Sequence, residues 1–429
     1  MLLNEYESGE KYVNLSLRGR RLDGLTESER SFLTRLLYTA VERKITYDYY
    51  ISSLSARSIS DIDTRLKNIL RLGLVQLTAM DNIPRYAAVD ETVRLCDKPH
   101  ERSFVNGVLR AAVRAIEGEG LPLPPREKNL ARYLSVAYSF PLSLCKRFIR
   151  DFGEADAERL LSAFGSVDYT DLTVNPTRSS REALLSELSA MGLSARPSEY
   201  SALGVRVFGA FNPMRVPSFA SGAFFVQDAA SLISAEALGT RAGDTVVDVC
   251  SCPGGKSFAA AALSGGGAKI YAFDLHSSKL SLVSEGAERL GFGISVGELD
   301  GRGNDASLLG LADRVICDVP CSGLGVLGKK PDIRYRAADT DDSLPDLQYE
   351  ILCSAARYLR LGGELLYSTC TLSRSENEEV FLRFLSESSD FECCDFSVGG
   401  LHSKGGMLTL LPHIHGTDGF FMAKLRRIK

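Results

Sequence analysis

Apolar residues recur at intervals of three and four from about residue 28 to residue 117. This spacing places them on one face of each of several helices. Three such faces are made by Phe32, Leu33, Leu36, Leu37 and Ala40, by Leu66, Ile69, Leu70, Leu74 and Leu77, and by Val105, Val108, Leu109, Ala112, Val113 and Ile116. The stretch 118–125, rich in glycine and proline, is typical of a linker. The pattern predicts an all-α domain over residues 1–125.

The apolar period changes after about residue 165. Helical spacing continues up to that point, whereas residues 169–175 and 204–208 have the pattern of strands. Between them, residues 179–191 are expected to form a helix that opens with the capping-box pattern Ser179-x-x-Glu182. We therefore expect a helical linker followed by a small α+β unit over residues 126–215.

From residue 216 to residue 429 the chain alternates between strand and helix patterns. The predicted strands cover residues 245–249, 269–274, 314–317 and 363–369. Such alternation is typical of a mostly parallel sheet with helices on both faces. The sequence thus predicts an α/β Rossmann-type domain at the C-terminal end.

The composition narrows the choice of partners and compartment. Hydrophobic residues make up 45% of the chain and its net charge is −4, which argues against bulk attraction to nucleic acid but leaves room for a local basic groove. No apolar run has the length of a signal peptide or a membrane span, so we expect a cytoplasmic protein with no membrane partner. The ten cysteines are then expected as thiols. They lack the paired spacing of zinc ligands, and no metal is expected.

The first candidate site is the turn DVCSCPGGK, which runs from Asp248 to Lys256 between a predicted strand and a predicted helix. Its two glycines let the backbone approach a ligand, and the N-terminus of the helix favours an anionic group. Asp274 ends the next strand, about where an acid reaches the ribose hydroxyls of an adenosine cofactor. The turn has neither the P-loop nor the G-x-G-x-x-G pattern. A tight turn without a ligand is the alternative.

Two cysteines follow the next two predicted strands. Asp318-Val-Pro-Cys321 comes after the third strand and Cys370 after the fourth. Ligands bind beyond the carboxyl ends of the strands in such sheets, so these groups are expected to converge on one crevice. A thiolate added to C6 of a cytosine would make C5 nucleophilic toward a methyl sulfonium, and a second group would assist release. Lys256 nearby would raise the reactive fraction of a thiol.

The motifs DVCSCPGGK, DVPCSGLG followed by KKPDIRY, and YSTCTLSRSENEEV resemble those of the RNA 5-cytosine methyltransferases of the Sun/Fmu (NOL1/NOP2/Sun) family. VQDAASL and the closing GTDGFFMAKL fit the same domain. The segments RLKNILRLGLVQL, AAVDETVRL and SFVNGVLR resemble a NusB-like RNA-binding helical domain. The unit at 167–215 is similar to the RNA-recognition-like insert of such proteins. The resemblance covers nearly the whole chain.

The resemblance implies a monomeric enzyme that methylates RNA, with 16S small-subunit ribosomal RNA as the expected substrate. Cys370 would be the nucleophile that forms the adduct, and Cys321 would assist product release. Asp318 would touch both the cytosine base and the cofactor. The resemblance implies that S-adenosylmethionine is held by Cys250, Ser251, Cys252, Pro253, Gly254, Gly255, Lys256, Asp274, Asp300 and Asp318.

Two other functions stay open at this point. A DNA cytosine methylase would use Cys321 as the nucleophile instead of Cys370. A non-catalytic RNA-binding or antitermination factor would carry the sheet without its chemistry, which the full set of acids, lysine and thiols argues against. Cofactor binding separates the second alternative from an enzyme.

Three polar segments have a functional and a structural interpretation. Basic residues that could position phosphates, or form a solvated surface, are Lys329, Lys330, Arg334 and Arg336 in one loop and Arg65, Lys67, Arg71 and Arg110 in the helical domain. Ser373-x-x-Glu376 has the pattern of a capping box. We expect it to open a helix near the C-terminal end.

Overall fold

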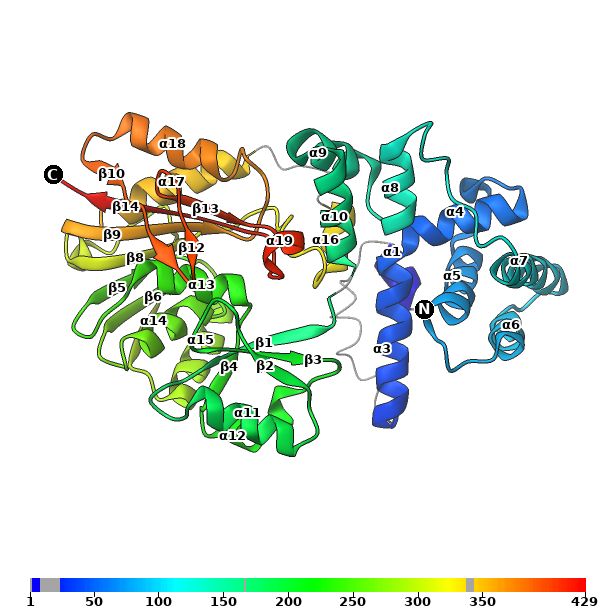
Figure 1. Ribbon diagram of the computed structural model, residues 1–429, viewed down its shortest axis with the longest axis horizontal. Coiled ribbons are helices and arrows are strands. Elements are labelled where there is room, and N and C mark those ends of the chain that lie inside the picture. Colours follow the sequence, from blue (N-terminus) through cyan, green and yellow to red (C-terminus); the bar gives the residue numbers. More distant parts are fainter. Residues whose placement is uncertain (1, 8–23, 166, 337–342) are drawn as a thin grey trace. The chain divides into compact units, whose positions relative to one another are not determined.

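The computed structural model describes residues 2–7, 24–165, 167–336 and 343–429 (Figure 1). Contacts divide the chain into two compact units. We call the first the helical unit; it holds residues 1–165 and 327–339. The second, the sheet unit, holds residues 166–326 and 340–429. The chain therefore leaves the sheet unit after residue 326, contributes a segment to the helical unit, and then returns.

The helical unit is all-α in its described part, as the apolar spacing predicts. Its main core joins one face of each of several helices around fully buried residues such as Leu70, Leu74 and Leu109. The helices are α1 (Leu2–Glu7), α3 (Glu27–Glu42), α4 (Lys44–Ser55), α5 (Thr64–Ala79), α6 (Arg85–Arg94), α7 (Pro99–Glu117), α8 (Leu130–Tyr138), α9 (Leu142–Phe152), α10 (Glu154–Phe164) and α16 (Pro331–Arg336), with the 3-10 turn η2 (Ile59–Asp61).

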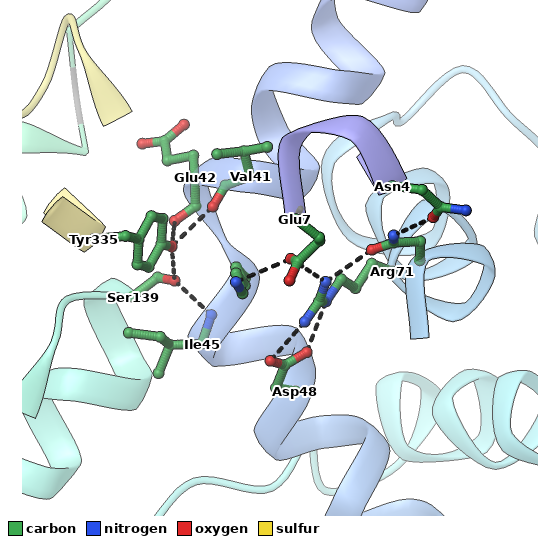
Figure 2. A network of polar contacts seen from close by, with 11 residues as sticks. Asn4, Glu7, Val41, Glu42, Ile45, Asp48, Arg71, Ser139 and Tyr335 are labelled. Carbon is green, nitrogen blue, oxygen red and sulfur yellow. Dashed lines mark hydrogen bonds and ion pairs between the residues drawn. The ribbon is translucent and has the colours of Figure 1, made fainter. Parts of the chain in front are cut away.

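The segment that contains α16 packs against the C-terminal end of α3 (Figure 2). The Arg334 side chain is 1% exposed; it donates to the Leu327 carbonyl at 3.1 Å and pairs with Glu42 at 3.1 Å. The Tyr335 hydroxyl donates to the carbonyls of Val41 at 2.8 Å and Glu42 at 3.1 Å. Arg334 is thus neither a phosphate ligand nor a solvated residue, and both interpretations of it are wrong.

A second buried arginine lies in the same unit. Arg71 on α5 is 3% exposed and makes four hydrogen bonds, two to Asp48 and one each to Glu7 and Asn68 (Figure 2). The distances are 2.7 to 2.8 Å. Because its guanidinium is buried and bonded to Asp48, Glu7 and Asn68 of the helical unit, Arg71 cannot form part of an RNA-binding face. The expectation that it would do so is wrong.

The sheet unit begins with a small α+β module. Its four-stranded sheet has the order β2-β3-β1-β4 and is antiparallel throughout. The strands are β1 (Tyr169–Val174), β2 (Ala195–Pro197), β3 (Gly204–Phe208) and β4 (Phe224–Val226). Helix α11 (Arg181–Ala190) begins one residue later than the expected capping box allows, because Ser180, and not Ser179, accepts a hydrogen bond from the amide of Ala183.

The large sheet has eight strands in the order β10-β14-β9-β8-β5-β6-β7, with β13 paired to β14 (Figure 1). Neighbouring strands from β9 to β7 pair in parallel. Strand β14 pairs antiparallel with β9, β10 and β13. The strands are β5 (Thr245–Asp248), β6 (Lys269–Asp274), β7 (Ile294–Glu298), β8 (Ala312–Asp318), β9 (Leu359–Thr369), β10 (Phe391–Cys393), β13 (Met407–Leu410) and β14 (Phe420–Arg427). A separate hairpin joins β11 (Ser397–Val398) and β12 (Leu401–His402).

Helices cover both faces of the large sheet (Figure 1). Successive strand residues alternate between two cores, as Val246 and Val247 do, because side chains along a strand point to opposite faces. One core holds α13 (Ala229–Leu238), α14 (Gly255–Leu263) and α15 (Ser277–Leu290); the other holds α17 (Leu344–Ala356) and α18 (Glu378–Glu387). Short helices α12 (Pro217–Ala220) and α19 (Pro412–His415), and the 3-10 turns η3 (Pro213–Arg215) and η4 (Ala306–Leu308), lie in loops.

The expected fold class is confirmed: an all-α part, a small α+β module and a mostly parallel α/β sheet follow one another along the chain. The expected boundaries at residues 125 and 215 stay predictions. None of the described helices combines the length and apolar character that spanning a membrane would require.

Candidate active site

The candidate residues sit where four neighbouring parallel strands end. Strands β9, β8, β5 and β6 are adjacent in this order, so their carboxyl ends lie along one edge of the sheet (Figure 1). Asp248, Asp274 and Asp318 are the last residues of β5, β6 and β8, and Cys370 follows the end of β9. The edge therefore gathers groups that are far apart in sequence, as the crevice rule for open α/β sheets predicts.

The turn after β5 leads directly into α14, which begins at Gly255. Gly254 has a φ of +109°, and an added Cβ there would lie 2.4 Å from the ring of Phe258. Only glycine fits such a position without strain. The amide of Cys252 donates to Asp274 Oδ2 at 3.1 Å, which ties the turn to the end of β6. The hydroxyl of Ser251 is buried and has no hydrogen-bond partner in the described part of the chain.

Four carboxylates surround the Cys250 thiol. Burial, together with the negative charges of Asp248, Asp318, Asp274 and Asp300, raises the pKa of Cys250 well above its usual range. An added Cβ on Gly301, next to Asp300, would lie 3.4 Å from the Cys250 sulfur, which places the end of the β7 loop beside the turn. Carboxylates that are far apart in sequence therefore gather around one thiol at this edge of the sheet.

Asp248 is the most deeply buried of these acids. Its Oδ2 accepts a hydrogen bond from Ser257 at 2.6 Å, but its Oδ1 has no partner among the residues that the structure describes. Burial raises the pKa of Asp248 to about 7. A buried carboxylate oxygen without a partner is costly unless a ligand donates to it. Asp300, in contrast, is half-exposed and pairs with Arg302 at 2.6 Å.

Lys256 and Asp318 form an ion pair inside the site. Lys256 is buried, with 9% of the residue exposed. Its ammonium lies 2.7 Å from Asp318 Oδ2. It also lies 5.0 Å from the centre of the Phe420 ring. Asp318 Oδ1 accepts from the Ser368 hydroxyl at 2.7 Å. Lys256 is thus directed at a carboxylate, whereas the sequence suggested that it would act on a thiol.

The two candidate thiols are in contact. Cys321 Sγ and Cys370 Sγ lie 3.3 Å apart, and all ten cysteines are present as thiols. The hydrogen bond to Cys370, with burial, raises the pKa of Cys321 well above its usual range. The two sulfurs are close enough to share a proton, and either one can be the donor.

The loops that carry the thiols approach a third loop very closely. The Gly325 amide donates to the Cys370 carbonyl at 2.9 Å, and the Gly419 amide donates to the Gly325 carbonyl at 2.8 Å. An added Cβ on Gly325 would lie 1.8 Å from the Gly419 carbonyl oxygen. Packing thus requires glycine at both Gly325 and Gly419.

Several polar residues of the site were not predicted from the sequence. Ser368 holds Asp318, and Glu376 accepts hydrogen bonds from Ser322. The capping-box interpretation of Ser373-x-x-Glu376 is wrong, because α18 begins at Glu378 with Asn377 as its N-cap. The pattern alone gives no sign of this, since the true partner of Glu376 is distant in sequence. No three His, Cys, Asp or Glu side chains come together as metal ligands would within the described ranges.

Three family models match the chain. A family described as 16S rRNA methyltransferase RsmB/F matches residues 235–426, the NusB family matches residues 2–114, and a Methyltr_RsmF/B-like ferredoxin-like domain matches residues 140–212. The first match covers the large sheet and the second covers part of the helical unit. The third covers most of the small module together with helices that precede it.

Known proteins resemble the chain over its full length. A probable ribosomal RNA small subunit methyltransferase B from Synechocystis sp. is 35% identical and covers 100% of this chain and 98% of its own. The ribosomal RNA small subunit methyltransferase B of Pseudomonas putida is 33% identical, with coverage of 98% and 95%. The crystal structure of the protein PH0851 superposes with a TM-score of 0.77 at 25% identity, over 99% of this chain and 96% of that one.

Proposed function

The chain belongs to the ribosomal RNA small subunit methyltransferase B family, and from this premise we propose that it transfers a methyl group from S-adenosylmethionine to C5 of a cytosine in small-subunit ribosomal RNA. Membership confirms the resemblance to Sun/Fmu enzymes and to NusB. The observation that carries the proposal is the 3.3 Å contact between Cys321 and Cys370 beside the Lys256–Asp318 pair. Two thiols in contact at a cofactor-type edge suit covalent catalysis on a pyrimidine.

The residues at the edge fit S-adenosylmethionine. This cofactor supplies an electrophilic methyl group on a positively charged sulfonium, and it also carries an ammonium group. The acidic ring of Asp248, Asp274, Asp300 and Asp318 suits a cationic ligand, and the unsatisfied Asp248 oxygen can accept from a donor. In this proposal Asp274, at the end of β6, accepts hydrogen bonds from the ribose hydroxyls. The turn Cys250 to Lys256 contributes backbone groups and the Ser251 hydroxyl.

We assign Cys370 as the nucleophile because its Thr-Cys motif resembles the motif that carries the nucleophile in the Sun/Fmu enzymes. In this assignment, a Cys370 thiolate would accept a hydrogen bond from the Cys321 thiol across their 3.3 Å contact. It forms a bond to C6 of the cytosine, and the electrons of the C5=C6 bond make C5 nucleophilic. C5 would take the methyl group from the sulfonium, whose S–CH3 bond breaks with its electrons staying on sulfur as a neutral thioether. The C5 proton then leaves to water, the C5=C6 bond is rebuilt and the C6–S bond breaks. Cys321 then hydrogen-bonds to the departing sulfur and so assists release.

Lys256 and Asp318 have a supporting role in this proposal. Asp318 is fixed by Lys256 on one oxygen and by Ser368 on the other. A carboxylate held in this way keeps lone pairs for the amino group or protonated N3 of the cytosine. Such a bond would help the ring accept the electrons that the thiol addition displaces.

The test is to remove each thiol separately and incubate the variant with cofactor and unmethylated small-subunit ribosomal RNA. Cys370→Ala should neither methylate the RNA nor become linked to it. Cys321→Ala should accumulate a covalent protein–RNA complex that survives a denaturing gel, because release is slowed. Cys393→Ala, which removes an exposed thiol, serves as the control. Trapping by Cys370→Ala instead would reverse the roles, and a product without 5-methylcytosine would overturn the proposal.

A further inference from the structure

The buried side chain of Glu376 holds the loop that carries Cys321 on both sides of the thiol. Glu376 is 4% exposed; its Oε2 accepts from the Ser322 amide at 2.8 Å and its Oε1 accepts from the Ser322 hydroxyl at 2.6 Å. Gln348 donates to Oε2 at 3.1 Å and also to the Pro320 carbonyl at 2.9 Å. The residues before and after Cys321 are therefore both tied to the Glu376 carboxylate, one directly and one through Gln348.

Asn377, the next residue along the chain, holds the loop that carries Cys370 in the same way. Asn377 is buried; its Oδ1 accepts from the Thr369 hydroxyl at 2.5 Å and its Nδ2 donates to the Thr371 carbonyl at 3.0 Å. Thr369 and Thr371 are the neighbours of Cys370. Asparagine at an N-cap normally accepts from an amide of the helix it opens. Asn377 occupies the N-cap of α18 but makes no such bond, because its side chain is used on the thiol loop.

Glu376 and Asn377 are adjacent in the chain, so the same short segment before α18 binds both the Cys321 loop and the Cys370 loop. The Tyr367 hydroxyl donates to the Glu376 carbonyl at 2.6 Å, and the hydroxyls of Ser322 and Thr371 lie 2.8 Å apart, which joins the loops directly. The hydrogen bonds of the Glu376 and Asn377 side chains described above go to residues around the thiols and not to sulfur. A carboxylate that accepts hydrogen bonds from buried groups fixes their positions more firmly than a neutral acceptor does.

We propose that Glu376 and Asn377 are positioning residues that hold the two thiols in contact, Glu376 acting on Cys321 and Asn377 acting on Cys370. The inference rests on the proposed function, because it assigns each residue to the half-reaction of the thiol that it supports. Loss of Glu376 moves the group that assists release. Loss of Asn377 moves the nucleophile itself. The two variants should therefore fail at different steps, although neither side chain takes part in the chemistry.

The experiment follows one turnover with full-length enzyme, saturating S-adenosylmethionine and unmethylated small-subunit ribosomal RNA. Denaturing gels give the rate at which the covalent complex forms and the rate at which it disappears. Glu376→Gln should slow disappearance by about tenfold or more, as expected for a lost charge-assisted hydrogen bond, and should leave formation near the wild-type rate. Asn377→Ala should slow formation by about tenfold and trap little complex. The KM for S-adenosylmethionine should not change in either variant.

Two further variants make the outcome decisive. Glu379→Gln makes the same chemical change on an exposed residue three positions along, and should behave as wild type. Ser322→Ala removes the hydroxyl bonded to Glu376 and Thr371 but keeps the amide bond, so it should slow release less than Glu376→Gln does. If Glu376→Gln does not fold, Ser322→Ala tests the role of the Glu376 contact in its place. A folded Ser322→Ala or Glu376→Gln enzyme with wild-type release would overturn the inference.

The result separates this inference from the proposed function. If Cys321→Ala traps RNA but the Glu376 and Asn377 variants show equal losses at both steps, these residues support the fold only, and the proposed function stands. If wild type and Cys321→Ala never form a covalent complex under these conditions, the proposed function itself fails. A clean split between release and formation supports both.

Discussion

Both units bury charged side chains, but they use them differently. In the helical unit, Arg71 and Arg334 are enclosed and paired with carboxylates or carbonyls of that unit. In the sheet unit, Asp248 keeps an oxygen without a partner among the described residues, and the Asp318 side chain stays 30% exposed although two groups hold it. Charged side chains are buried in both units. The units differ in whether these side chains keep a lone pair or a charge that a ligand could use.

The comparison separates structural charges from functional ones. A buried charge costs free energy, which a complete set of partners offsets. A closed network therefore stabilises a fold once it is present but offers nothing to substrate. An incomplete network costs stability, and a ligand that completes it offsets that cost. Removing a closed charge should accordingly lower stability and spare binding, whereas removing an open one should do the reverse.

The largest effect is expected at Arg71. Arg71→Ala leaves Asp48 and Glu7 without their shared cation, and breaking a buried ion pair typically costs about 3–5 kcal/mol. Hydrogen exchange measured by mass spectrometry should show faster exchange in α4 and α5 but unchanged exchange in β5 and β6. The S-adenosylmethionine affinity should stay at the wild-type value. Arg110→Ala, on an exposed arginine of the same unit, is the control. A loss of cofactor affinity in Arg71→Ala would contradict the division between the units.

The next effect is expected at Asp274, in the open set. Asp274→Ala should weaken S-adenosylmethionine binding by about 2–4 kcal/mol, because charge-assisted hydrogen bonds to ribose hydroxyls are lost. Isothermal calorimetry on the folded variant gives the value. Glu298→Ala removes an equal charge from the paired position on β7, where the side chain is exposed, and should change affinity little. Unchanged affinity in Asp274→Ala would remove this residue from the proposed cofactor site.

The same difference explains how much the sequence could predict. The ends of β5, β6, β8 and β9 follow strongly apolar runs, so the positions of Asp248, Asp274 and Asp318 were predictable from local pattern. The fold class followed from the alternation of strands and helices. The antiparallel strands β10, β13 and β14 were not predicted, because the hydrophobic pattern after residue 375 does not reveal which strand pairs with which.

Long-range partners explain what the sequence could not predict. Arg334 and Tyr335 lie in a loop that looks basic and solvated, yet their partners Glu42 and Val41 are almost three hundred positions away. Glu376 matches a capping box locally but binds Ser322 at the start of a different loop. Local patterns predict elements and strand ends. They do not predict which polar residues a distant segment will enclose, and this enclosure decides whether a charge is structural or functional.

The smallest effect concerns the pH dependence of Asp248. Burial raises the pKa of Asp248 to about 7, whereas an aspartate in an unfolded chain titrates near pH 4. Between about pH 4 and 7 the folded protein holds a proton that the unfolded chain has lost, so the contribution of this group to stability falls as pH rises. The slope is about 1.4 kcal/mol per pH unit. The contribution is complete below about pH 4 and is lost above about pH 7.

Asp248→Asn cannot titrate, so urea unfolding of the sheet unit should depend less on pH in this variant between pH 5 and 8. Asp390→Asn, on an exposed aspartate, should keep the wild-type slope. Cofactor binding gives an independent readout, because a cationic ligand near Asp248 favours its charged form. The affinity of the wild type for S-adenosylmethionine should therefore rise from pH 6 to pH 8, and that of Asp248→Asn should not. Parallel pH profiles for the two proteins would mean that Asp248 is already charged and satisfied, and would move it from the open set of charges to the closed one.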